Sequence, residues 1–283
     1  MLILLPPSEG KADAGTGRRL DLTRLSLPEL TDARARVLAA LVQLCGGAGP
    51  AAATGAAAAS AGGAAPDEAA ALEALGLTPG LAGELRRNAR LERAATAEAG
   101  RLYTGVLYEA LDLATLPAAA QRAARRSVLI SSGLWGAVRL TDRIPPYRCP
   151  IGARLPGVGA LSAYWRRELG PALEAAAGRG PVLDLRSGAY AATWTPRGEL
   201  AERTVTVRVL HERDTPSGPV RSVVSHFNKA TKGRLVRDLL TAGARPRTAD
   251  GLVAALREAK YTVLEQPVAA GRPRAVDVVV TQL

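Results

Sequence analysis

Three short apolar runs, each followed at once by small or polar residues, place the strongest constraint on how this chain can fold. They occupy residues 2–5, 127–130 and 182–185. Runs of this length without polar alternation are typical of strands buried on both faces of a sheet. Helical segments separate them along the chain, so the sequence predicts an α/β fold with a mixed central sheet and surrounding helices.

The rest of the chain supplies further elements and no clear boundary. Further strands are predicted at 204–210, 220–225, 261–264 and 276–281, and further helices at 81–102, 117–126 and 160–177. Trp135 and Gly136 predict a short helical or turn segment. Apolar residues on one face after residue 233, and a second helix capped by Thr248, predict a helix-hairpin-helix-like element rich in arginine.

The 283 residues contain no internal repeat and no clear linker, which predicts one domain over 1–283. Within it, residues 46–65 are almost only Ala, Gly and Ser, and this composition predicts a low-complexity insert that the fold can lose. No apolar run approaches the roughly 18 residues of a membrane span. The apolar N-terminus is too short for a signal peptide, so we expect a cytoplasmic protein without a membrane partner.

The charge of the chain favours an anionic partner. The formal net charge is +11, and 33 of the 37 basic residues are arginines. The two cysteines, Cys45 and Cys149, fit a reducing compartment. Neither they nor the two histidines stand in a metal-ligand spacing, so we predict no metal and no cofactor, and we disfavour direct iron coordination.

The four lysines are placed unevenly in a chain that otherwise uses arginine. Lys11 follows the first strand, and Lys229 and Lys232 lie within 226–233. Arginine cannot replace lysine where an amine must lose its proton. We therefore predict Lys11 as the first candidate for a base or nucleophile, with Ser8 and Tyr190 beside it. Lys229 is the second candidate, and Lys232 is predicted to bind an anion.

The stretch 131–154 is predicted to form the centre of the site. It carries four arginines, and its two adjacent prolines exclude helix or central strand there. An ordinary basic surface loop is the alternative. The residues predicted to bind a nucleic acid or another anion are Ser132, Gly133, Trp135, Arg139, Tyr147, Arg148, Arg154, Ser187, His226, Lys232 and Arg234. Because ligands bind beyond the carboxyl ends of parallel strands, segments 8–11, 131–136 and 186–190 are predicted to meet.

Five stretches together resemble the YaaA family of bacterial peroxide-stress proteins. They are MLILLPPSEGK (1–11), YTGVLYEAL (103–111), SSGLWGAVRLTDRIPPYRCPIGARL (131–155), VLDLRSGAYAATW (182–194) and SVVSHFNKATKGRLVRDLL (222–240). The resemblance implies a single compact α/β domain with a positively charged cleft, a helix-hairpin-helix-like element and DNA binding. It also implies a role in limiting iron-driven damage under hydrogen peroxide, and it brings no settled reaction.

Three functional hypotheses remain. The first is a monomer that binds duplex DNA with little sequence specificity, with arginines on phosphates and Trp135, Tyr147 or Tyr190 stacked on a base. The second is an enzyme that acts on a nucleobase, a nucleotide or another anionic small molecule through a pocket of Lys, Ser, Arg and Tyr. The third is a stress-induced binding scaffold without chemistry. The first is our main prediction.

Overall fold

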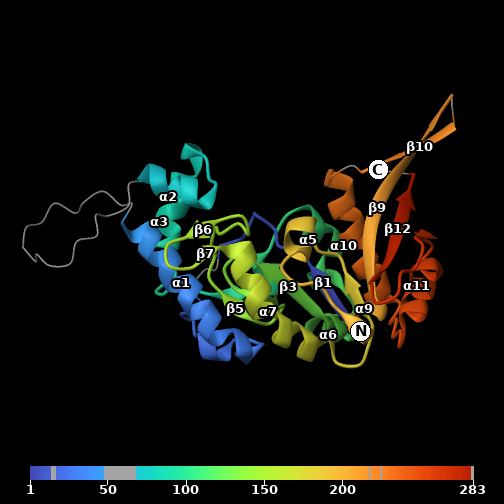
Figure 1. Ribbon diagram of the computed structural model, residues 1–283, viewed down its shortest axis with the longest axis horizontal. Coiled ribbons are helices and arrows are strands. Elements are labelled where there is room, and N and C mark those ends of the chain that lie inside the picture. Colours follow the sequence, from blue (N-terminus) through green and yellow to red (C-terminus); the bar gives the residue numbers. More distant parts are fainter. Residues whose placement is uncertain (14–16, 48–67, 217, 224, 282–283) are drawn as a thin grey trace, which may run out of the picture.

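Five parallel strands form the middle of an eight-stranded sheet in the computed structural model, which describes residues 1–13, 17–47, 68–216, 218–223 and 225–281. Their order is β3 (Val128–Ser132), β1 (Leu2–Leu5), β8 (Val182–Asp184), β9 (Thr204–Thr215) and β12 (Arg274–Val280). Antiparallel strands β4 (Gly136–Arg139) and β11 (Thr262–Glu265) close the two edges. The molecule is thus a compact α/β domain with a mixed central sheet, as predicted (Figure 1).

The chain reverses the direction in which it builds the sheet between β1 and β8. After β1 it forms β3 on one side, and β8, β9 and β12 are then added in turn on the other side. Such a reversal opens a crevice beyond the carboxyl ends of the two strands, where open α/β sheets bind ligands. Segment 6–11 after β1 and segment 185–190 after β8 therefore lie at the place where a site is expected.

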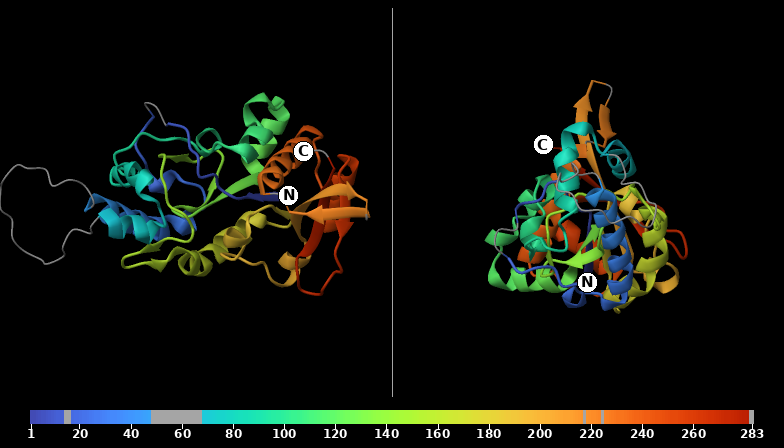
Figure 2. Two further views of the ribbon diagram at one scale, coloured as in Figure 1. Left: turned by 90° about the horizontal axis from the view of Figure 1, so that it is seen from above. Right: turned by 90° about the vertical axis from the view of Figure 1, so that its left-hand side faces the viewer.

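Helices cover both faces of the sheet. They are α1 (Thr31–Gly46), α2 (Glu68–Leu75), α3 (Ala82–Asn88), α4 (Ala99–Leu102), α5 (Val106–Leu111), α6 (Ala118–Ser127), α7 (Leu161–Ala177), α8 (Gly188–Ala191), α9 (Gly198–Glu202), α10 (Ser225–Thr241) and α11 (Ala249–Glu258). Helices α6 and α10 lie on one side of the sheet and α7 on the other (Figure 2). Helices α1, α2 and α3 gather at one end of the molecule, and β9, β12 and α11 at the other (Figure 1).

Short elements fill the connections. Four 3-10 helices span Leu22–Arg24, Pro28–Leu30, Pro79–Leu81 and Leu113–Thr115. Strand β2 (Ala97–Glu98) pairs with β5 (Arg143–Ile144), and β6 (Arg154–Leu155) pairs with β7 (Gly159–Ala160). These small ladders fix the long excursions on either side of β3 and β4.

Buried Arg34 ties α1 to the turn after β3. Its side chain has no exposed surface, and its guanidinium donates to the carbonyl oxygens of Trp135 (3.1 Å), Ala137 (2.7 Å) and Ser26 (2.8 Å). Backbone carbonyls buried without a donor would destabilise the fold, so this arginine has a structural role.

Most of the predicted elements are confirmed. The three apolar runs become parallel neighbours, and β9 forms the predicted hairpin with β10 (Gly218–Ser222). The hydroxyl of Thr248 caps α11 by accepting from the amide of Gly251. No helix in the described part of the chain is both long and apolar enough to cross a membrane.

One predicted helix is wrong because tertiary pairing overrides local pattern. The helix expected over 81–102 ends at Asn88, since Thr96 donates to the carbonyl of Arg18 and Ala97 pairs with Ile144. The turn expected at Trp135 is present, and Gly136 already begins β4, which returns antiparallel along β3. Of the low-complexity insert 46–65, residues 48–65 lie outside the described residues.

Candidate functional site: a lysine between tyrosines at the sheet edge

Lys11 is positioned by the backbone that follows β1. Pro6 and Pro7 end the strand, and Lys11 forms an isolated antiparallel bridge with Tyr103. On either side of this bridge, Thr104 donates its amide to the carbonyl of Gly10, and Ala12 donates to that of Leu102. The loop is thus held at two points, and the direction of the Lys11 side chain is fixed.

The ammonium group of Lys11 lies against two aromatic rings. Its Nζ is 4.3 Å from the ring centroid of Tyr147 and 5.2 Å from that of Tyr103, and it donates to the carbonyl of Ser8 at 3.0 Å. The electron-rich faces of tyrosine rings attract a cation. We call Lys11, Tyr103, Tyr147 and Ser132 the Lys11 cluster.

A chain of three hydroxyl groups runs under the lysine. Ser132 Oγ accepts from the amides of Trp135 (2.8 Å) and Leu134 (3.2 Å) and lies 2.6 Å from Tyr147 Oη. Tyr147 Oη in turn lies 2.8 Å from Tyr103 Oη. A hydroxyl oxygen has two lone pairs, and both of those on Ser132 are occupied. Ser132 therefore donates its proton to Tyr147, and a second hydrogen bond joins the hydroxyl groups of Tyr147 and Tyr103.

Burial shifts the acid–base balance of this cluster toward neutral groups. Burial lowers the pKa of Lys11 to about 8, with the charge of Glu9 opposing the shift and the positive charge of Arg148 adding to it. Burial also raises the pKa values of Tyr103 and Tyr147, which keeps both phenols protonated. An amine with a pKa near 8 is about one-tenth unprotonated at pH 7, so Lys11 can supply a lone pair.

Arg148 stands at the mouth of the cluster. Its Nε is 3.1 Å from a carboxylate oxygen of Glu9, and its side chain keeps 23% of its surface exposed. Buried Asn88 holds the backbone of Arg148 by donating to its carbonyl (2.7 Å) and accepting from its amide (3.0 Å). The backbone of Arg148 is therefore fixed, while its side chain stays partly exposed and can contact an anion.

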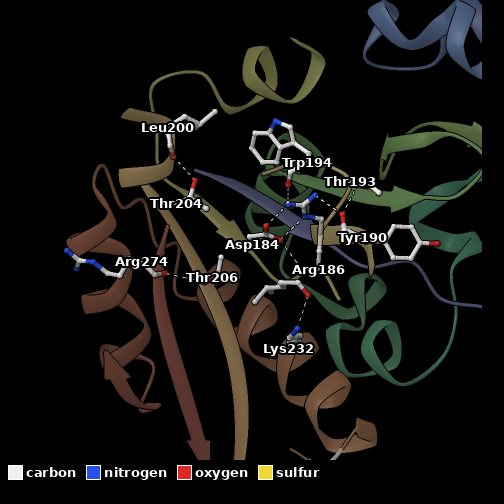
Figure 3. Close-up of polar contacts among 11 residues, drawn as sticks. Asp184, Arg186, Tyr190, Thr193, Trp194, Leu200, Thr204, Thr206, Lys232 and Arg274 are labelled. Carbon is white, nitrogen blue, oxygen red and sulfur yellow. Dashed lines mark hydrogen bonds and ion pairs between the residues drawn. The ribbon is translucent and has the colours of Figure 1, made fainter. Parts of the chain in front are cut away.

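A network of polar contacts fixes the segment after β8 (Figure 3). Asp184 and Arg186 make a buried ion pair at 2.6 Å, and Arg186 also donates to the carbonyls of Tyr190 (3.0 Å) and Trp194 (2.8 Å). This network fixes α8, which carries Tyr190. Burial raises the pKa of the Tyr190 phenol, and the charge of Glu9 adds to the shift, so Tyr190 belongs to the same surroundings as Lys11.

The structure brings together part of the predicted set. The predicted residues that meet at this edge are Ser8, Lys11, Ser132, Tyr147, Arg148 and Tyr190. Four of them follow or end β1, β3 and β8, and Tyr147 and Arg148 come from the loop after β5. The parallel pairing of the three strands places their carboxyl ends side by side, as predicted.

Stacking of exposed aromatics on a base is contradicted. Trp135 has no exposed surface, Tyr147 keeps 3% and Tyr190 keeps 8%, because all three pack into the core. Gly133 is packed against protein backbone and does not face a ligand-sized space, because a Cβ there would lie 2.1 Å from the carbonyl oxygen of Cys149.

Two of the predicted basic residues donate to backbone carbonyl groups of the protein itself. Lys232 is buried and donates to the carbonyl of Leu185 at 2.9 Å, so it supports the end of β8 and is not open to an anion (Figure 3). Arg139 donates to the carbonyl of Arg126, at the amino-terminal end of β3, because β4 has carried it back along the sheet.

Four of the remaining predicted residues are exposed and take no part in these contacts. Ser187 begins α8 without a side-chain cap, Arg154 lies on β6, and Lys229 and Arg234 lie on α10. The helix α10 already starts at Ser225, so His226 lies within it, but its side chain is outside the part that the structure describes.

Some residues of the site cannot be identified from the sequence. Tyr103 was visible only as one of two tyrosines within six residues, and it forms both the ring contact and the hydroxyl chain. Tyr108 stacks on it at 5.5 Å and donates to the carbonyl of Pro6. Nothing local marks Asn88 or Asp184, because their roles depend on contacts with distant segments.

One cavity borders the Lys11 cluster, and a second one is lined in part by four arginines. One, of about 590 Å³, borders Tyr103, Thr104 and Tyr108 and carries both acidic and basic side chains. The other, of about 620 Å³, is lined by Arg18, Arg19, Arg24 and Arg143 with a single acid, Asp21. Among the described residues, no group of three or more His, Cys, Asp or Glu is placed to hold a metal ion.

These features define an α/β protein with a lysine–tyrosine cluster at the reversal point of a parallel sheet. The family model described as "Peroxide stress protein YaaA" matches residues 1–266. The chain therefore belongs to the YaaA family of peroxide stress proteins, as the sequence resemblance predicts.

Relatives with curated sequences agree with this assignment. A UPF0246 protein of Streptomyces coelicolor is 54% identical over 284 residues, which cover 100% of both chains. A UPF0246 protein of Corynebacterium glutamicum is 37% identical over 94% of this chain and 96% of its own length. An uncharacterized protein of Campylobacter jejuni is 33% identical over 146 residues, 52% of this chain and 54% of its own.

Proposed function

We propose that this protein serves in the peroxide-stress response by binding duplex DNA, and that it thereby limits iron-driven damage to that DNA. Membership of the YaaA family and the net charge of +11 support the proposal. We also propose that it works as a cytoplasmic monomer, which agrees with two unbonded cysteine thiols.

The observation that carries DNA binding is the cavity lined by four arginines. Arg18, Arg19 and Arg24 are exposed there, and in the described ranges none of the three takes part in an ion pair. The single acid of the cavity, Asp21, is already bonded to the amide and hydroxyl of Thr23. Unpaired guanidinium groups around a hollow suit the phosphates of a nucleic acid.

The two C-terminal helices are our second proposed contact with DNA. Residues 242–248 join α10 to α11, and Arg234, Arg245 and Arg247 are exposed on this helix-hairpin-helix-like unit. Because such contacts would go to phosphates, binding should have little sequence specificity.

Thiol chemistry is disfavoured as the protective activity. Both cysteines are buried, and burial raises the pKa of the Cys45 thiol to about 11 and that of Cys149 further above its usual range. The thiolate is the form that reacts with peroxide, so neither residue has the surroundings of a peroxide-reactive cysteine.

The test is a titration of a labelled duplex followed by fluorescence anisotropy. Affinity should fall with salt with a log–log slope of roughly −0.9 per phosphate contacted. The double variant Arg19→Ala/Arg24→Ala should bind at least about fivefold more weakly and with a shallower slope, since each phosphate contact contributes to both quantities.

Arg179→Ala is the matched control. Arg179 is exposed just before β8 and does not line the cavity, so its replacement should leave both quantities unchanged. Equal binding by all three proteins, or binding indifferent to salt, would reject the arginine cavity as the DNA site.

One observation favours a second function in the same molecule. The half-buried Lys11 lies beside a chain of protonated phenols, which is the setting of an amine that works as a base or nucleophile. An enzyme that acts on a nucleobase, a nucleotide or another anionic small molecule would use this cluster. Replacement of Lys11 by Arg keeps charge and reach, so a peroxide-survival defect of this variant would favour chemistry over simple binding.

A further inference from the structure

We propose that Lys11 forms a Schiff base with the open-chain aldehyde of an abasic deoxyribose in damaged DNA. The inference rests on the proposed DNA binding and gives the Lys11 cluster a substrate class. Oxidation of DNA by iron and peroxide releases bases and leaves such aldehydes, so the chemistry belongs to the stress in which the family is named.

The contacts of Lys11 leave its amine available. Its nearest polar partner is the carbonyl of Ser8, and its other neighbours are the Tyr147 and Tyr103 rings. The closest carboxylate, that of Glu9, is directed to Arg148 at 3.1 Å. Among the described residues no acid makes an ion pair with Lys11, so no direct partner holds the amine in its charged form.

The aromatic walls favour the neutral amine and the imine. Tyr103 and Tyr147 are 2% and 3% exposed, and they close the floor of the cluster to water. An imine is lost by hydrolysis, so a site poor in water prolongs its life. The exposed tip of Arg148 stands beside this floor, where it can bind the phosphate next to the sugar.

The reaction balances without any further reagent. The lone pair of Lys11 Nζ attacks the aldehyde carbon, which forms a C–N bond and breaks the carbonyl π bond. The carbinolamine then loses water, which carries away the aldehyde oxygen and both protons of the neutral amine and leaves a C=N bond. No group is oxidised or reduced, and arginine cannot take this role because its guanidinium stays protonated.

Borohydride trapping tests the proposal on the full chain. Sodium borohydride reduces an imine to a stable amine, so a labelled duplex with one abasic site should become covalently attached to the protein. An intact duplex should not. Lys11→Arg should give less than about one-tenth of the wild-type adduct, while its DNA affinity by anisotropy stays within about twofold.

Lys260→Arg is the matched control, because Lys260 is exposed just past the end of α11, is not part of the Lys11 cluster, and keeps its positive charge in the variant. It should give the wild-type amount of adduct. If Lys11→Arg unfolds, peptide mapping of the wild-type adduct by mass spectrometry decides the question, since the added mass must lie on Lys11.

A second probe separates this inference from the function on which it rests. Deoxyribose 5-phosphate carries the same aldehyde without a duplex, and borohydride should attach it to Lys11 of the wild-type protein. Loss of DNA binding together with labelling of Lys11 by the sugar phosphate would refute only the proposed function. Normal DNA binding without adduct, or adduct on another lysine, would overturn the Schiff base.

Discussion

At the scale of single residues, the position of Lys11 shows how burial selects an amine over a guanidinium. The charges and titratable groups that act on it are Glu9, Glu84, Arg148, Cys149, Tyr103 and Tyr147. Burial dominates and lowers its pKa to about 8, so the neutral form gains as pH rises through this value.

The rate of borohydride-trapped adduct should therefore rise about 25-fold between pH 6.5 and 8.5, with the neutral fraction of the amine, and level off above about pH 9. Single-turnover trapping at a series of pH values measures it. The variant Glu9→Gln removes a charge that favours the ammonium, so its midpoint should move to lower pH. A flat profile, or a midpoint near that of a free lysine, would contradict the assigned environment.

Arg34 is a second residue whose role is set by burial, and it serves stability. We expect Arg34→Met to lower the free energy of unfolding by about 3 kcal/mol, because several buried carbonyls would lose their donor. Denaturant unfolding measures this. Exposed Arg36 on the same helix is the control, and Arg36→Met should change the free energy by less than about 0.5 kcal/mol.

At the scale of elements, α10 packs closely on α5 through a glycine. A Cβ on Gly233 would lie 2.1 Å from the carbonyl oxygen of Leu107, so the two helices approach at a point where only hydrogen fits. Helix α5 starts just after Tyr103, and its position thus depends on α10.

Gly233→Ala should destabilise the protein by about 1–3 kcal/mol, since one of the two helices must shift. A Cβ on Gly83 in α3 would make only an ordinary contact, at 3.8 Å, with the flexible end of Arg86, so Gly83→Ala should be neutral or stabilising by up to about 1 kcal/mol. Thermal unfolding of both variants tests the contrast. Equal stability of the two would show that α10 and α5 can separate freely.

At the scale of the whole molecule, the prediction for 46–65 still stands on composition alone. Small side chains bury little apolar area, so ordering them would cost more backbone entropy than packing returns. A protein that lacks 46–65 should therefore unfold cooperatively, with a midpoint within a few degrees of the intact chain, by circular dichroism. Failure of this variant to give soluble, cooperatively unfolding protein would show that the segment is a structural element.

The sequence alone determined the architecture to the extent that local pattern controls it. Runs 2–5, 127–130 and 182–185 are short and mostly apolar, which predicted buried strands and, with them, the strand end at which Lys11 lies. The excess of arginine over lysine identifies Lys11 as a candidate base or nucleophile from the sequence alone, since the two cations differ chiefly in their ability to lose a proton.

Only the tertiary structure decided which polar residues share the site. From the sequence, Trp135 and Lys232 are indistinguishable from functional residues. Packing buries Trp135, however, and Lys232 donates to the Leu185 carbonyl. Tyr103 and Asn88 are brought to the site from segments that local pattern predicted as part of one helix and its end. The reason is physical: burial and hydrogen bonding depend on contacts between residues far apart in the chain, and local periodicity carries no information about those contacts.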